Sequence, residues 1–204
     1  MAGPLRTNNE LFTYGDYVTW LDDKRWELID GITYDMTPTP NTYHQELSGK
    51  LSTEIYVFLK GTKCHVYYAP FDVRLPEANQ SDEETLNVVQ PDISVICDRS
   101  KLDDYGCKGA PDLIIEILSP ATSKKDRITK FELYERFKVK EYWLVHPDER
   151  FVQVFTLGEN GQYGRPEFYT NTQILPCFIL PGLNINLAEV FGEEEEEAEK
   201  IGKD

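Results

Sequence analysis

The sequence has no long apolar run. No stretch of its 204 residues reaches the about 18 consecutive apolar side chains that span a bilayer. Its first residues also lack the apolar segment of a signal peptide, so we expect a cytoplasmic protein. The four cysteines, at positions 64, 97, 107 and 177, show no Cys-x-x-Cys spacing, which excludes the common zinc motifs. We expect all four to be reduced thiols rather than a disulfide framework.

The chain also has little positive charge, with 36 acidic residues against 21 basic ones. Nucleic-acid binding would therefore depend on a local basic patch and bound cations, not on the overall field. Hydrophobic residues at 40% and aromatic residues at 12% exclude a disordered chain. We expect one domain over residues 1–192, followed by an acidic, disordered tail over residues 193–204.

Turn signals and apolar periodicity predict an α/β domain. Asp30-Gly31 between two β-prone runs indicates a hairpin. We expect helices over residues 13–21 and 41–60, after Ser119–Asp126 and after Asn186. We expect strands over residues 64–75, 87–96, 112–118, 141–146, 150–157, 162–170 and 172–177, with loops over residues 76–84 and 98–111.

Two of these strands each carry a carboxylate within an apolar run. Asp92 follows Pro91 at the start of an Ile-Ser-Val-Ile segment, and Glu116 lies within Leu-Ile-Ile-Glu-Ile-Leu. Strand alternation puts Asp92 on one face of the first strand and Glu116 on one face of the second. If the strands are neighbours, the two carboxylates converge and can share a divalent cation. The alternative is that each lies at a sheet edge or pairs with an arginine.

Pro91-Asp92 followed by Glu116-Ile-Leu118 resembles the PD-(D/E)XK core of restriction-endonuclease-like enzymes, with Leu118 in place of the lysine. A wider set of residues, from about residue 10 to residue 190, is similar to the Uma-two-type endonucleases of that superfamily. The set comprises Trp26–Gly31, His44, Gln90–Asp92, Pro111–Pro120, Asp126, Lys130, Tyr134 and Glu141–Trp143. The resemblance implies a mixed sheet flanked by helices, with an N-terminal hairpin and extra C-terminal strands. It also implies DNA cleavage with Mg²⁺ or Mn²⁺ bound by Asp92, Glu116 and the Ile117 carbonyl.

Lys130 is the candidate replacement for the lysine missing at position 118. It lies four residues before Tyr134 on the expected helix, so both side chains can return to the metal face. Related families supply the lysine from this helix. The alternative is a surface lysine. Lys130 also belongs to a basic concentration that a phosphate backbone could approach, or that could be a solvated helix face: Lys124, Lys125, Arg127, Lys130, Arg136, Lys138 and Lys140.

Glu27 and His44 are further candidate site residues. Glu27 resembles the additional acidic residue near the metal in many superfamily members; its alternative is an ion pair with Lys24 or Arg25. His44 shares a helix stripe with core leucines, which is typical of a core histidine. It could instead contact phosphate, act as general acid or orient a carboxylate.

The sequence therefore favours a metal-dependent endonuclease acting on DNA. Its rival is a catalytically weak or inactive relative that serves as a nucleic-acid or protein interaction module, which the acidic balance and Leu118 favour. A hydrolase acting on a small phosphate is a third possibility. Homodimers are common in the superfamily, and a homodimer is the expected assembly if there is one.

Overall fold

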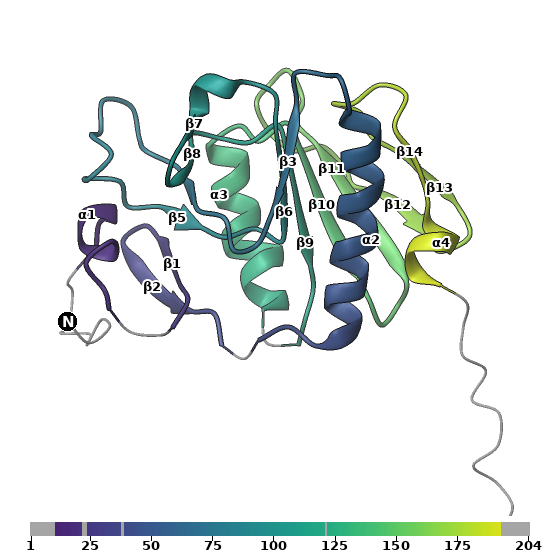
Figure 1. The fold of residues 1–204 in the computed structure, drawn as a ribbon, viewed down its shortest axis with the longest axis horizontal. Coiled ribbons are helices and arrows are strands. Elements are labelled where there is room, and N and C mark those ends of the chain that lie inside the picture. Colours follow the sequence, from purple (N-terminus) through teal and green to yellow (C-terminus); the bar gives the residue numbers. More distant parts are fainter. Residues whose placement is uncertain (1–10, 22–23, 38, 121, 193–204) are drawn as a thin grey trace, which may run out of the picture.

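The computed structural model describes residues 11–21, 24–37, 39–120 and 122–192 as two mixed sheets flanked by helices (Figure 1). The expected tail at residues 193–204 lies outside these ranges. In the central sheet all neighbours are antiparallel except β9 and β10. Its strand order is β12 (Glu167–Thr170), β11 (Phe151–Thr156), β10 (Glu141–His146), β9 (Leu113–Ile117), β6 (Ile93–Ile96) and β3 (His65–Tyr68).

The second sheet contains the expected N-terminal hairpin. Asp30 and Gly31 both have positive φ, at 51° and 72°, as a two-residue hairpin turn requires. The strand order is β2 (Ile32–Asp35), β1 (Trp26–Ile29), β5 (Val88–Val89), β4 (Val73–Arg74), β8 (Gly106–Lys108) and β7 (Leu102–Asp103). Two further short strands, β13 (Ile174–Pro176) and β14 (Asn184–Asn186), pair with each other.

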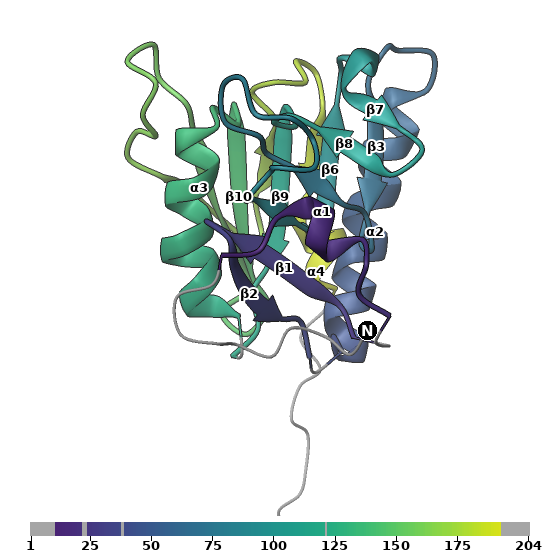
Figure 2. The ribbon, with the colours of Figure 1, turned by 90° about the vertical axis from the view of Figure 1, so that its left-hand side faces the viewer.

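The helices begin where capping residues predict. Thr13 forms a capping box with Asp16 at α1 (Tyr14–Tyr17), and Asn41 caps α2 (Thr42–Leu59). The parallel strands β9 and β10 require a crossover, which is the π-helical segment η2 (Lys125–Lys130) continuing into α3 (Phe131–Arg136). The remaining helices are η1 (Arg99–Lys101) and α4 (Leu187–Phe191). Figure 2 shows α2 and α3 on opposite sides of the central sheet, with the β1–β2 hairpin in front.

Strand alternation divides the core between the two faces of the central sheet. On β9, Leu113, Ile115 and Ile117 pack in one apolar cluster with the buried face of α2. Ile114 and Leu118 pack in another, with α3 and the second sheet. Glu116 therefore points into the layer between the central sheet, η2–α3 and the second sheet. This is the layer that contains the site.

Four sequence expectations need correction. The strand expected over residues 87–96 is two strands in different sheets, β5 and β6, with Pro91 between them. The strand expected over residues 64–75 is two strands in different sheets, β3 and β4, because Pro70 has no N–H for a ladder. The loop expected over residues 98–111 contains η1 and the short hairpin β7–β8. The strand β14 was not expected at all, because residues 184–186 alternate with asparagine and lack a β-prone run.

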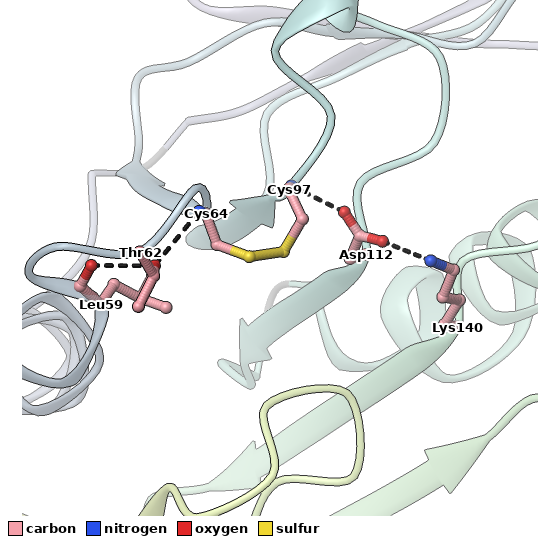
Figure 3. The surroundings of a disulfide bond; sticks show 6 residues. All are labelled: Leu59, Thr62, Cys64, Cys97, Asp112 and Lys140. Atoms are coloured by element: carbon pink, nitrogen blue, oxygen red, sulfur yellow. Dashed lines mark hydrogen bonds and ion pairs between the residues drawn. A yellow bond between two sulfur atoms is a disulfide. The ribbon is translucent and has the colours of Figure 1, made fainter.

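The expectation of four reduced cysteines is also wrong. Cys64 and Cys97 form a disulfide (Figure 3). The strands β3 and β6 are antiparallel, and His65 pairs with Ile96. Cys64 and Cys97 are the next residues beyond this pair, so they lie opposite each other. A separation of 33 residues gave no local signal, because only the strand pairing brings the two together. Cys107 and Cys177 are free and buried.

Within the described ranges, no helix combines the length and apolar character needed to cross a membrane.

Candidate active site

Asp92 and Glu116 lie on neighbouring strands. Ile93 pairs with Ile115 in the antiparallel ladder of β6 and β9, so continuing the register by one residue puts Asp92 opposite Glu116. Opposed residues of an antiparallel pair have side chains on the same face, with Cβ atoms about 4.5–5.5 Å apart. The convergence expected from strand alternation is therefore present.

Both carboxylates line a pocket of about 360 Å³. The pocket lies where the N-terminal end of α2, the C-terminal end of β9, the start of the crossover helix and the base of the hairpin meet. A pocket of this size is within the usual range of small-molecule sites. Its walls include Arg25, Met36, Thr37, Asn41, His44, Asp92, Glu116, Ile117, Leu118, Ser119, Thr122, Lys125, Asp126, Lys130 and Asp148.

Glu116 is held by two side chains from the crossover helix. Lys130 Nζ lies 2.8 Å from Glu116 Oε1, and Tyr134 donates its hydroxyl to the same oxygen at 2.7 Å. Glu116 Oε2 accepts no hydrogen bond from any described residue. Burial raises the pKa of Glu116 to about 8, against the opposing attraction of Lys130. Glu116 thus presents one oxygen to the pocket while the other is fixed.

Lys130 is buried, and three carboxylates surround its ammonium group. It lies 2.7 Å from Glu27 Oε1 and 3.7 Å from Asp126 Oδ1, besides its contact with Glu116. Burial alone would lower the pKa of Lys130, but these charges hold it well above its usual value. Lys130 is therefore a permanent cation at the pocket wall and not a snorkelling surface lysine.

Glu27 lies behind this wall rather than on it. Its side chain is fully buried; its oxygens contact Lys130 and Lys125 and accept the Gln90 main-chain N–H at 2.9 Å. The charges of Lys130 and Lys125 hold the pKa of Glu27 below its usual range, although burial acts the other way. The structure does not bring Glu27 to the pocket. Lys130 lies between Glu27 and Glu116 and contacts both.

Asp92 is oriented by a main-chain group and a histidine. The Ile117 N–H donates to Asp92 Oδ2 at 2.7 Å, and His44 Nε2 lies 3.2 Å from the same oxygen. Burial lowers the pKa of His44, but the hydrogen bond to Asp92, the Asp92 charge and the Ile117 main chain together raise it overall. His44 is in the first turns of α2, where the Asn41 cap receives its N–H. Of the roles considered for His44, orienting a carboxylate is the one its contacts match.

Comparison with known proteins identifies the family. The sequence model of Uma2, described as "Putative restriction endonuclease", matches residues 14–188, which include every candidate site residue. The chain belongs to the Uma2 family.

One curated protein and one solved structure are similar to this chain. The chain is 28% identical over 151 residues to the uncharacterized protein slr1290 of Synechocystis sp., covering 72% of this chain and 75% of that one. A crystal structure described as a "putative nuclease belonging to DUF820" from Anabaena variabilis superimposes with a TM-score of 0.69. It is 20% identical, and the match covers 88% of this chain and 97% of that one. This likeness establishes the fold of the Uma2 protein.

The charges in the Uma2 site suit a divalent cation. Asp126 has a buried Oδ1 with no hydrogen-bond partner among the described residues, and burial raises the pKa of its carboxyl group. A cation with oxygen ligands would relieve this surplus of negative charge. Four carboxylates line the pocket against three cationic side chains: Asp92, Glu116, Asp126 and Asp148 against Arg25, Lys125 and Lys130.

The protein ligands for such an ion would be few. Within the described ranges, no three His, Cys, Asp or Glu side chains gather closely enough to hold a metal by themselves. Asp92 and Glu116 would supply two oxygens, and the Ile117 carbonyl, which also interacts with His44, would be the third protein ligand that the resemblance implies. Water and phosphate would complete the shell, as is usual for Mg²⁺.

Sequence reasoning missed the roles of Lys125 and Asp126. Lys125 was only one of several basic residues, yet its Nζ lies 2.6 Å from Glu27 Oε2. Asp126 appeared only as a matching position. Their position on the same helix as Lys130 could have indicated that they lie near the site. Most of the other basic residues bind elsewhere: Arg127 to His146, Arg136 to Asp30, Lys138 to the Gly161 carbonyl and Lys140 to Asp112.

Proposed function

We propose that this protein is a divalent-metal-dependent endonuclease that hydrolyses phosphodiester bonds in DNA. The observation that carries the proposal is the pair of opposed carboxylates, Asp92 and Glu116, facing one pocket with the buried ammonium of Lys130 against Glu116. Membership of a family described as restriction endonucleases supports it.

Asp92 and Glu116 would hold Mg²⁺ or Mn²⁺, with help from the Ile117 carbonyl. When bound, such an ion lowers the pKa of a coordinated water and neutralises charge on the phosphate. Asp92 keeps its orientation through His44 and the Ile117 N–H, and Glu116 through Lys130 and Tyr134. Residues that fix ligands in this way typically change metal affinity or activity about 10–100-fold when removed.

Lys130 would supply a fixed positive charge beside the reacting phosphate. Because its pKa is raised, it stays protonated and acts as a hydrogen-bond donor and electrostatic stabiliser, not as a general base. Glu27 keeps this ammonium group in position from behind, together with Lys125. Tyr134 likewise stays protonated, since burial and the Glu116 charge raise its pKa well above the usual value.

The test is conversion of supercoiled plasmid to nicked or linear DNA with Mn²⁺ or Mg²⁺, alongside calorimetric titration with Mn²⁺. We expect wild type to cleave DNA and to bind Mn²⁺, and Asp92→Asn and Glu116→Gln to lose both. Asp112→Asn is the matched control, because Asp112 is a buried carboxylate of the same sheet that pairs with Lys140 outside the pocket. Circular dichroism verifies that each variant is folded.

The same experiment separates the rival functions. Single-stranded DNA, RNA and a nucleoside triphosphate are offered in parallel, which identifies the substrate class. A wild-type protein that binds Mn²⁺ and cleaves none of them contradicts the nuclease proposal. A protein that neither binds Mn²⁺ nor cleaves fits the interaction module instead.

A further inference from the structure

Arg25 lies at the rim of the pocket, immediately before β1. It is half-buried and lines the same pocket as Asp92 and Glu116. Its main-chain carbonyl accepts the Met36 N–H at 3.0 Å, which fixes it to the base of the hairpin. The main chain of Arg25 is therefore held in place at the pocket wall.

Gln90 holds the Arg25 side chain through one nitrogen. Arg25 Nε donates to Gln90 Oε1 at 2.9 Å, while Gln90 Nε2 donates to Asp72 Oδ1 at 2.7 Å and to the Tyr17 hydroxyl at 3.1 Å. A carboxylate only accepts hydrogen bonds, so the Gln90 amide must turn its NH₂ group toward Asp72. This leaves its carbonyl oxygen for Arg25. The amide is thus locked in the orientation that anchors the guanidinium.

The two terminal nitrogens of Arg25 make no hydrogen bond or ion pair with any described residue. The neighbouring acid, Glu27, is not available, because Lys125 and Lys130 occupy its oxygens. Both of these lysines are thereby paired already. Arg25 is accordingly a cation of the pocket whose two terminal nitrogens donate to none of the described residues.

We propose that Arg25 is a phosphate-contacting residue that binds a backbone phosphate of the nucleic-acid strand entering the pocket. A guanidinium anchored at Nε offers its two NH₂ groups as a fork that matches two phosphate oxygens. Gln90 is a positioning residue for that fork. This inference rests on the proposed function and deepens it, because it names the contact that brings the strand to a site with an excess of acid.

The test is a fluorescence anisotropy titration of a short labelled duplex with Ca²⁺ in place of Mg²⁺, repeated over a range of salt concentrations. We expect Arg25→Gln to raise Kd about fivefold or more on every sequence. We also expect the slope of log K against log salt to fall by about 0.9, the loss of one phosphate contact. Lys24→Gln is the matched control, since it removes the adjacent positive charge, which binds Asp35 at 2.8 Å. It should leave the slope unchanged.

Gln90→Met tests the positioning role. It removes both the Oε1 acceptor and the Nε2 donor and leaves the Arg25 charge, so binding should weaken in the wild-type background but not further in the Arg25→Gln background. Equal losses in both backgrounds would mean that Gln90 acts only on the fold. Equal Kd and slope for Arg25→Gln and Lys24→Gln would overturn the proposal for Arg25, as would a wild-type protein that binds no DNA.

Cleavage is measured separately, so the two proposals fail in different ways. A protein that binds DNA with an Arg25-dependent salt slope yet never cleaves it contradicts only the nuclease function. A protein that cleaves DNA and ignores Arg25→Gln in both Kd and slope contradicts only the phosphate contact.

Discussion

Lys130 Nζ lies 2.8 Å from Glu116 Oε1, although the two residues come from different elements. Glu116 is on the central strand β9, and Lys130 is on the crossover helix that follows it. The lysine absent from position 118 of the strand is thus matched in space by one that is 12 positions further along the chain. Leu118 occupies the position where the motif has its lysine, and it packs in the apolar cluster beside α3.

Replacing Lys130 by methionine should destabilise the fold by about 3–5 kcal/mol, because it leaves buried carboxylates without their partner. The double variant Glu116→Gln/Lys130→Met should recover part of that loss, since one unpaired charge is gone. Urea denaturation of the two single variants and the double variant measures the coupling. Strictly additive losses would show that the two groups do not stabilise each other.

A lysine at position 118 should substitute in part for Lys130. Leu118 lines the pocket and lies on the same face of its strand as Glu116, so Leu118→Lys directs an ammonium group to the same place. In the Lys130→Met background we expect this change to restore measurable plasmid nicking. Leu118→Gln is the control for the change of size and polarity. Equal activity of the two variants would contradict a role for the charge.

Lowering the pH should destabilise the protein through His146. Burial lowers the pKa of His146, and the nearby Arg127 charge lowers it further. A histidine with a depressed pKa in the folded state takes up its proton first in the unfolded state. Its contribution is therefore complete above about pH 6.5 and is lost as the pH falls below that value. Urea denaturation at several pH values should show a shallower decline for His146→Gln, and an unchanged decline would refute this assignment.

Reducing the Cys64–Cys97 disulfide should lower the free energy of unfolding by about 2–4 kcal/mol, because the bond closes a long loop in the unfolded chain. Denaturation with and without a phosphine reductant measures the difference. The double variant Cys64→Ser/Cys97→Ser should not respond to the reductant. A wild-type protein equally stable under both conditions, with an intact mass showing two free thiols, would contradict the bond.

Local patterns in the sequence were sufficient for much of the site. Alternation within two apolar strands put Asp92 and Glu116 on converging faces, and four-residue spacing put Lys130 beside Tyr134. The face of each side chain depends only on the geometry of its own element, and the convergence of the two carboxylates also required the two strands to be neighbours, as they are. The crossover helix begins as a wider π-helical turn, yet its two side chains still reach the same carboxylate oxygen.

Contacts between elements that are distant in the sequence could not be predicted in this way. For Glu27 the sequence suggested its neighbours Lys24 or Arg25, whereas the structure pairs it with Lys125 and Lys130, about 100 residues away. Nothing in a local pattern reveals that the hairpin packs against the crossover helix. The disulfide was missed for the same reason, since it follows from the pairing of two strands.

The ion pairs of Glu27 with Lys125 and Lys130 have a consequence for how the pocket forms. Asp92 and Glu116 belong to the central sheet, but the residue that steadies the lysines belongs to the hairpin sheet. A chain in which only the central sheet has formed would contain Asp92 and Glu116, but the pocket wall formed by the lysines would lack its support from Glu27. The complete pocket wall therefore requires the hairpin to pack against the crossover helix.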